Sequence, residues 1–232
     1  MSTTRRRTMT TTSSASVNWE DMYRQVLMNT ATSVVVPEGV TKLRYRMFCS
    51  ATNMTDITLP STLASINGTY VFEGCTSLTH VYYNNSTTAL AQGTFSGCNA
   101  ITDIANVIPS GATVIANEQF RGCNGLTDVV VPEGIQRCEI GWIYGSNIVS
   151  ITYPTTITSI SNVSGSLNLS NINYMACLAT TPPGISVNAF GSATSYSFPI
   201  YVPDAVVSTY KTASTYWQNY ASRIQGISNL TT

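Results

Sequence analysis

Side chains able to carry out acid–base or hydrolytic chemistry are scarce in this sequence of 232 residues. Its only histidine is His80, which a serine hydrolase would need as its general base. Neither a G-x-S-x-G turn nor a glycine-rich phosphate-binding motif is present to complete such a site. Asp103 and Asp128 are candidates for a glycosidase carboxylate pair, but an open surface has no apolar cleft to raise the pKa of one carboxyl. The sequence therefore predicts a protein that is not an enzyme, and an enzyme built on these aspartates is the least favoured alternative.

Six cysteines raise the question of a metal site or of disulfides. Cys75, Cys98 and Cys123 are separated by 23 and 25 residues, whereas a zinc site usually needs a close pair such as C-x-x-C. No such pair occurs in the chain. A thiol is small and apolar enough for a protein interior. We therefore expect no metal and no cofactor, and we predict that these three thiols form a buried column.

The three thiols belong to a repeat that must determine where they lie. Each closes an F-x-G-C turn, at residues 72–75, 95–98 and 120–123. Aromatic residues recur at intervals of 24, 23, 25 and 24 residues, at Phe48, Phe72, Phe95, Phe120 and Tyr144. Runs of the form L-x-x-L-x-L follow them at 54–60, 78–83, 101–109, 126–132 and 148–154, and an earlier partial copy covers 33–40. The run at 101–109 is imperfect, because Asn106 stands where the third apolar residue is expected.

Each run places three apolar side chains on one side of a short strand and its approach. One turn of chain cannot bury its apolar side alone, but stacked turns bury a continuous core. The sequence thus predicts a solenoid, a β-rich α/β repeat fold in which short parallel strands stack in one sheet.

The residues just described resemble those of a known family. The pattern F-x-G-C-x-x-L-x-x-I-x-L-P, with a period near 23, is similar to that of BspA-type leucine-rich-repeat proteins. The segment at 200–227 also resembles the end of many such proteins, so the resemblance covers about residues 33–227. It implies a leucine-rich-repeat solenoid that serves binding and adhesion. Such proteins are common on the surface of Bacteroides-like gut bacteria and of some protozoa, and phages also encode them.

The ends of a solenoid need caps, because the outermost turns would otherwise expose apolar surface. We predict a basic Ser/Thr-rich arm at 1–16, an N-terminal helical cap at 17–32, the leucine-rich-repeat solenoid at 33–203 and a helical C-terminal cap at 204–232. Trp19 and Tyr23 lie on the apolar face of a helix predicted at 17–28, which either covers the first turn or docks on another protein. Asp204 is expected to begin a helix that reaches Thr212, and a second helical stretch is expected near 216–223.

One side of the predicted sheet is the candidate ligand face. Matching positions of successive turns hold Asp56, His80, Asp103 and Asp128. A neighbouring column holds Tyr82, together with Thr58, Ala105, Val130 and Thr152. Acidic and aromatic groups in register suit a sugar or a basic patch on a protein. The alternative is a solvated face on which aspartate and threonine merely suit the start of a strand.

Charge and hydropathy limit the partners. Charged residues make up 9% of the chain, compared with about 25% in ordinary soluble domains. The formal net charge of +0 argues against a nucleic-acid binder held by phosphate contacts. No apolar run is long enough to span a membrane, and no apolar segment follows the basic N-terminal residues, so no secretory signal peptide is predicted. The basic residues Arg5, Arg6 and Arg7, together with Trp19 and Tyr23, are the candidates for docking on an assembly.

These observations leave two settings open. The basic arm and the absence of a predicted export signal favour a phage virion protein with a structural, decoration or host-adhesion role. A bacterial adhesin, at the cell surface or secreted, is the alternative. The expected partners are other virion or surface proteins, or a glycan, and a homo-oligomer is compatible with the stack.

Overall fold

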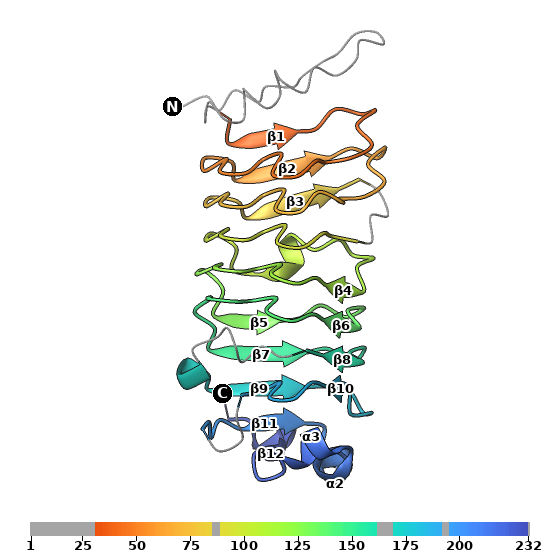
Figure 1. Cartoon of the computed structure of the whole chain (residues 1–232), viewed down its shortest axis with the longest axis vertical. Helices are drawn as coiled ribbons and strands as arrows, with labels where there is room; N and C mark the ends of the chain where they lie inside the picture. The colour runs from red at the N-terminus through yellow and green to blue at the C-terminus, as the bar shows by residue number, and fades with distance from the viewer. Residues whose placement is uncertain (1–30, 85–88, 162–168, 192–194, 232) are drawn as a thin grey trace.

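The chain winds into a stack of about eight turns, as the repeat predicted (Figure 1). The computed structural model describes residues 31–84, 89–161, 169–191 and 195–231. The predicted arm at 1–16 and nearly all of the predicted N-terminal cap lie outside the described residues, and Arg5, Arg6, Arg7, Trp19 and Tyr23 lie there with them.

One side of the stack carries the strands that the L-x-x-L-x-L runs predicted. Its first three turns form a parallel sheet of β1 (Ser33–Val35), β2 (Asp56–Leu59) and β3 (His80–Tyr83). The later turns form a second parallel sheet, which contains β5 (Asp128–Val130), β7 (Ser150–Tyr153), β9 (Tyr174–Cys177), β11 (Ile200–Val202) and β12 (Ile224–Gly226). All of these pairs are parallel and join neighbouring turns, which confirms the solenoid.

The prediction of one continuous sheet was wrong. Where the imperfect run predicted a strand, the chain forms a short 3-10 helix, η1 (Ile104–Asn106). The Asp103 carboxylate accepts a hydrogen bond from the Ala105 amide at 2.9 Å and so caps the helix. Because Asn106 cannot be buried as an apolar residue would be, Val107 takes the interior position and is fully buried.

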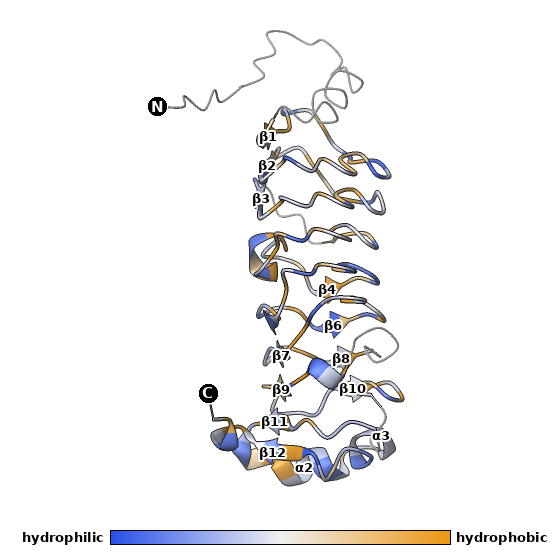
Figure 2. Cartoon of the chain, turned by 90° about the vertical axis from the view of Figure 1, so that its left-hand side faces the viewer, coloured by the Kyte–Doolittle hydropathy of each residue, from blue (hydrophilic) through white to orange (hydrophobic). Residues whose placement is uncertain are grey.

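A further sheet lies on another side of the stack and was not predicted. It contains β4 (Val114–Ile115), β6 (Arg137–Cys138), β8 (Ser159–Ile160) and β10 (Gly184–Ile185). These strands are only two residues long, so they carry almost no alternating pattern to recognise. Figure 2 shows them on a different side of the stack from β7 and β9. The three turns before β4 continue this side through isolated bridges from Lys42 to Ser65 and from Ile66 to Leu90.

Helical caps were predicted for both ends, and near the C-terminus only short helices are found. These are η3 (Asp204–Val206), α2 (Val207–Thr212), α3 (Thr215–Gln218) and η4 (Ile227–Asn229), and strand β12 lies between α3 and η4. Another 3-10 helix, η2 (Leu169–Asn171), lies earlier in the chain. Trp217 of α3 and Tyr220 contact the ring of Phe190 at centroid distances of 5.4 and 5.5 Å. These aromatic contacts bury apolar surface at the last turns of the solenoid.

Four phenyl rings run through the core, one in each of four successive turns. Phe48, Phe72, Phe95 and Phe120 stack with centroid separations of 5.5, 5.6 and 5.7 Å and interplanar angles no greater than 14°. This spacing follows from the separation of neighbouring parallel strands, about 4.8 Å. The repeat of aromatic residues is therefore a consequence of the turns lying in register.

Tyr144 was predicted to be the fifth aromatic member of this column, and that prediction was wrong. The Phe120 amide bonds to the Trp142 carbonyl at 2.7 Å, so Ile143 occupies the position that phenylalanine holds in earlier turns. The Trp142 ring meets Phe120 edge-on, at 6.4 Å and 80°. Tyr144, one residue past the buried Ile143, is 43% exposed and lies beneath the Arg121 guanidinium.

The predicted column of buried thiols is confirmed. Cys75, Cys98 and Cys123 are fully buried, and each Sγ donates a hydrogen bond to a phenylalanine carbonyl of the preceding turn, at 3.0, 3.1 and 3.0 Å. Ser146 continues the column, because its Oγ donates to the Phe120 carbonyl at 3.0 Å. The position thus requires a small side chain with one donor, and either a thiol or a hydroxyl satisfies it.

Carboxylates on the turn after the strands join one turn of chain to the next. Glu38 accepts hydrogen bonds from the Ser61 amide and hydroxyl at 3.0 and 2.9 Å. Glu133 accepts from the Thr155 amide and hydroxyl at 3.0 and 2.8 Å. These donors, with the backbone amide first, lower the pKa of both glutamates below the ordinary value of 4.5.

The phenyl stack leads to a prediction about stability. The substitution Phe95→Ala should lower the free energy of unfolding by about 3–5 kcal/mol, because it leaves a cavity between two buried rings. Tyr144→Ala should cost less than about 1 kcal/mol, because it removes only an exposed ring and its contact with Arg121. Urea denaturation followed by circular dichroism measures both values, and equal losses would contradict the assignment of Tyr144 to the outside.

The glutamate contacts predict a dependence on pH. A carboxyl whose folded-state pKa is lowered stabilises the fold above its unfolded-state pKa, and this stabilisation is lost as the pH falls through the folded-state pKa. The double variant Glu38→Gln/Glu133→Gln should therefore melt below the wild type at pH 7, and the difference should shrink as the pH falls below about 4. A difference in melting temperature that is constant from pH 7 to pH 3 would contradict this origin.

Candidate functional site

The predicted ligand face coincides with the outer side of the strands. Asp56 and His80 begin β2 and β3 and are direct partners in the parallel pairing. Asp128 begins β5 and is paired in register with Ser150 of β7. Asp103 belongs to neither sheet, because it caps η1 between them. The structure therefore brings Asp56 and His80 together, places Asp103 at the interruption and leaves Asp128 on its far side.

Hydroxyl groups of neighbouring turns hold the aspartates. The Ser33 hydroxyl donates to Asp56 Oδ1 at 2.5 Å, and the Thr55 hydroxyl donates to Asp56 Oδ2 at 3.0 Å. The Ser150 hydroxyl donates to Asp128 Oδ1 at 2.6 Å. The sequence analysis missed Ser33 and Ser150, although both occupy the aspartate position of an adjacent turn. These bonds fix the direction of the carboxylates, which makes them rigid acceptors for a partner.

An aromatic pair lies on β3, at the edge of the first sheet. The His80 and Tyr82 rings, two residues apart on β3, stack at 5.9 Å and 11°. His80 Nδ1 lies 3.0 Å from the Thr79 hydroxyl. Tyr82 is 51% exposed and is aligned with Thr58 of β2. The two rings together present a flat surface of the kind that contacts sugar rings or apolar side chains.

The second sheet also exposes an apolar side chain. Val130 is 63% exposed and is aligned with Thr152 of β7. The 3-10 helix η1 lies between β3 and β5, on the same side of the stack as the strands (Figure 2). It separates the patch around His80 and Tyr82 from the patch around Asp128 and Val130.

The edge of the solenoid opposite the glutamate contacts carries a polar network that the sequence analysis missed. Tyr70 donates a hydrogen bond to Glu118 at 2.6 Å, across two turns of chain. Its ring lies over Gly93, where an added Cβ would meet Tyr70 Cε1 at 2.2 Å. Arg121 lies 3.6 Å from the Glu118 carboxylate, and Arg46 forms an ion pair with Glu73 at 2.5 Å. The sequence does contain a pattern that could have revealed this network. Arg46, Tyr70 and Glu118 each stand two residues before a core phenylalanine, so they occupy equivalent positions in their turns.

The potential metal ligands of the described residues are dispersed, and most of the thiols are buried. Within them, no group of three or more histidine, cysteine, aspartate or glutamate side chains is placed to hold a metal ion. All six cysteines are free, and burial raises the pKa of Cys123 to about 12 and that of Cys177 to about 11. Cys49 alone is not buried. None of the helices in the described part of the chain has the length and apolar character that crossing a membrane requires.

Comparison with known proteins agrees with this architecture. A family model for the BspA type leucine rich repeat region matches residues 25–106 and 105–200, with six copies of the repeat. The crystal structure of a leucine rich repeat protein from T. pallidum aligns with a TM-score of 0.56 and 20% identity, over 78% of this chain and 83% of that one. A leucine rich cell surface protein from Faecalibacterium prausnitzii aligns with a TM-score of 0.47 and 20% identity, over 76% of this chain and 65% of that one. No curated protein sequence is a significant match to the chain.

Burial of the thiols predicts their reactivity. Alkylation proceeds through the thiolate, so a buried thiol with a raised pKa reacts slowly. Iodoacetamide should therefore label Cys49 in the native protein, and all six cysteines after denaturation. Peptide mass spectrometry measures the labelled sites, and Cys49→Ser should abolish native labelling. Labelling of Cys98 as fast as that of Cys49 would contradict the buried column.

Proposed function

Because this chain belongs to the BspA-type leucine-rich-repeat family, we propose that it is a non-enzymatic scaffold whose strand side binds a protein or a glycan. Proteins of this family are generally binding proteins without catalytic activity, and the family model spans most of the chain. The proposed contact surface comprises Asp56, His80 and Tyr82 on the first sheet and Asp128 and Val130 on the second.

The observation that carries this proposal is that exposed side chains of neighbouring turns are held in register on a rigid surface. Asp56 and His80 are fixed in register by the pairing of β2 and β3. Tyr82 and Val130 expose large apolar side chains beside charged ones. A partner that binds such a surface loses little free energy to ordering of the scaffold, because the stacked turns already hold the side chains in place. Exposed aromatic residues of this kind often supply most of the binding energy in an interface.

We place this activity at a bacterial cell surface, where proteins with BspA-type repeats are typically found. The expected role there is adhesion to a host protein or glycan. A phage virion is the second candidate, favoured by the basic segment of Arg5, Arg6 and Arg7. Neighbouring genes for capsid and tail proteins would support the virion, and neighbouring genes for surface export would support the cell.

The proposed surface can be tested with arrays of glycans and host matrix proteins. The fluorescently labelled wild-type chain should bind a limited set of spots. Tyr82→Ala/Asp128→Asn should weaken that binding by about tenfold or more, because both patches lose a contact residue. Tyr216→Ala is the matched control, because Tyr216 is a similarly exposed tyrosine on α3, away from the strand side.

The two variants can be compared only if both are folded as the wild type is. Circular dichroism and melting temperature should match the wild type for both, since both tyrosines are exposed. Loss of binding in Tyr216→Ala but not in Tyr82→Ala/Asp128→Asn would place the contact surface elsewhere and refute the proposal.

A further inference from the structure

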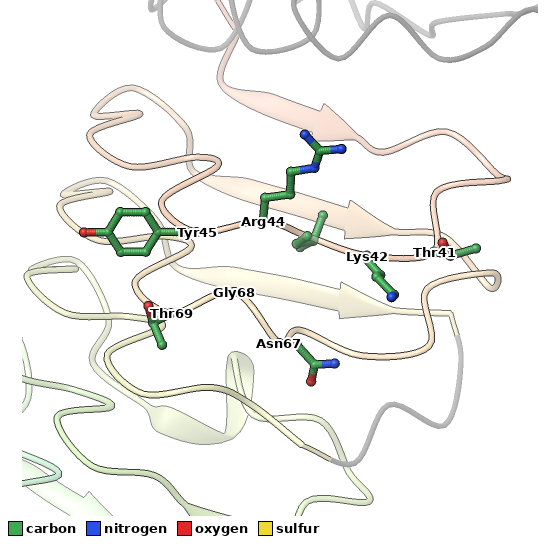
Figure 3. Close-up of a pocket in the computed structure, with 8 residues that line it drawn as sticks. Thr41, Lys42, Arg44, Tyr45, Asn67, Gly68 and Thr69 are labelled. Carbon is green, nitrogen blue, oxygen red and sulfur yellow. The ribbon is translucent and has the colours of Figure 1, made fainter.

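Backbone hydrogen bonds join neighbouring turns of the solenoid on three sides. These are the strand side, the side of β4, β6, β8 and β10, called here the short-strand side, and the edge formed by the F-x-G-C turns. The first two turns are in close backbone contact. Figure 3 shows residues 41–45 running beside residues 67–69, and a Cβ atom on Gly68 would lie 2.4 Å from the Arg44 carbonyl carbon.

The strand-side bond is missing where the third turn meets the fourth. The third turn begins at Leu78 and the fourth at Ile101. The Thr79 amide bonds to the Thr55 carbonyl of the second turn at 2.8 Å, and the same bond recurs between the fifth and sixth turns at 2.7 Å. Thr102 is the equivalent residue of the fourth turn. In the described part of the chain its amide forms no hydrogen bond with Thr79, because η1 replaces the strand there.

The short-strand side is also unpaired at this joint. The Ala91 amide bonds to the Ile66 carbonyl at 3.1 Å, and the same bond recurs between the fourth and fifth turns at 2.9 Å. Among the described residues, Ala116 forms no such bond with Leu90, so β4 begins its sheet. The third and fourth turns therefore lack regular backbone bonds on two sides, whereas the fourth and fifth keep those of the short-strand side.

The edge remains closed at the same joint. The Phe95 amide bonds to the Gln119 carbonyl at 3.1 Å, and the Gly97 amide bonds to the Arg121 carbonyl at 2.6 Å. The Phe95 and Phe120 rings stack beside them at 5.7 Å. The two halves of the solenoid are thus held along one edge, as two plates are held by a hinge.

One side chain closes the strand side across the joint. The Tyr83 hydroxyl donates a hydrogen bond to the Val107 carbonyl at 2.7 Å, and among the described residues no other hydrogen bond joins 78–84 to 101–109. We propose that the solenoid opens at this joint as a hinge, with the F-x-G-C edge as its axis and the Tyr83 hydroxyl as its latch. Opening exposes buried apolar side chains, so the closed state predominates and the open state is a local fluctuation.

The hinge lies between the two patches of the proposed contact surface. Tyr82 belongs to the half before the joint and Val130 to the half after it. Opening therefore changes the separation of the two patches. The hinge itself does not depend on what those patches bind.

The proposal is tested by the rate at which iodoacetamide labels a reporter thiol in the native chain, in a Cys49→Ser background. Val81→Cys places the reporter on the inner side of β3, next to the joint, where Val81 is buried. Ile57→Cys is the matched control, because Ile57 has the equivalent position on β2 and β2 is paired on both sides. The Val81→Cys thiol should react several-fold faster than the Ile57→Cys thiol, because only a buried thiol exposed by opening is alkylated.

The latch is tested with two further variants. Tyr83→Phe should speed labelling of the Val81→Cys thiol by about fivefold, because one hydrogen bond that holds the joint closed is lost. It should leave the Ile57→Cys thiol and the native Cys98 unchanged. Tyr82→Phe removes a hydroxyl from the same strand and should change nothing.

A graft should close the joint. Replacing residues 104–108 by the three residues 129–131 makes this run match that of the fifth turn and allows a continuous strand. Labelling of the Val81→Cys thiol should then slow to the rate of the Ile57→Cys thiol.

Contrary results would overturn the hinge. Equal rates for the Val81→Cys and Ile57→Cys thiols would show a joint as closed as a paired one. Labelling of Cys98 as fast as that of the Val81→Cys thiol would show separation of the whole joint without an axis at the edge. An equal increase at every thiol in Tyr83→Phe would show general destabilisation without a latch, whatever the graft does to folding.

Discussion

The whole structure depends on contact between equivalent side chains of successive turns. A single turn has too little apolar surface to fold alone, so every turn is stabilised by the turns above and below it. The clearest case is the stack of four phenyl rings, whose members are 23 to 25 residues apart in the chain and about one strand spacing apart in space. The buried thiols repeat the same arrangement beside the rings, and their hydrogen bonds to phenylalanine carbonyls satisfy polar groups that would otherwise be buried without a partner.

The tight turns of the F-x-G-C motif explain its glycine. Gly74, Gly97 and Gly122 have φ of 71°, 73° and 67°, a conformation that side chains with a Cβ rarely adopt. The residue two positions before the phenylalanine also has positive φ: it is Tyr70, Gly93 and Glu118 in these three turns, and Arg46 in the turn before them. Tyr70 bonds to Glu118, which also pairs with Arg121, and Arg46 pairs with Glu73. These contacts offset the backbone strain.

The uniform interior leaves the exterior free to vary, and the exterior is where the proposed contact surface lies. The strand side carries aspartates next to exposed aromatic and aliphatic side chains. In a chain with only 9% charged residues, Asp56 and Asp128 lie on this side.

The sequence by itself determined the repeat, the buried phenylalanine and thiol columns, and the alignment of Asp56 with His80. It could do so because alternation along a strand and a constant period decide which side chains face inward, and both are local properties. Only the tertiary structure decided that Trp142 and not Tyr144 meets Phe120, that η1 divides the strands into two sheets, and that a second side of short strands exists. These outcomes depend on register shifts of a single residue and on contacts between turns. The Tyr70–Glu118 hydrogen bond joins residues 48 positions apart, and Gly68 packs directly against the backbone of the preceding turn. Such contacts arise only when the turns are stacked, so no property of one turn could reveal them.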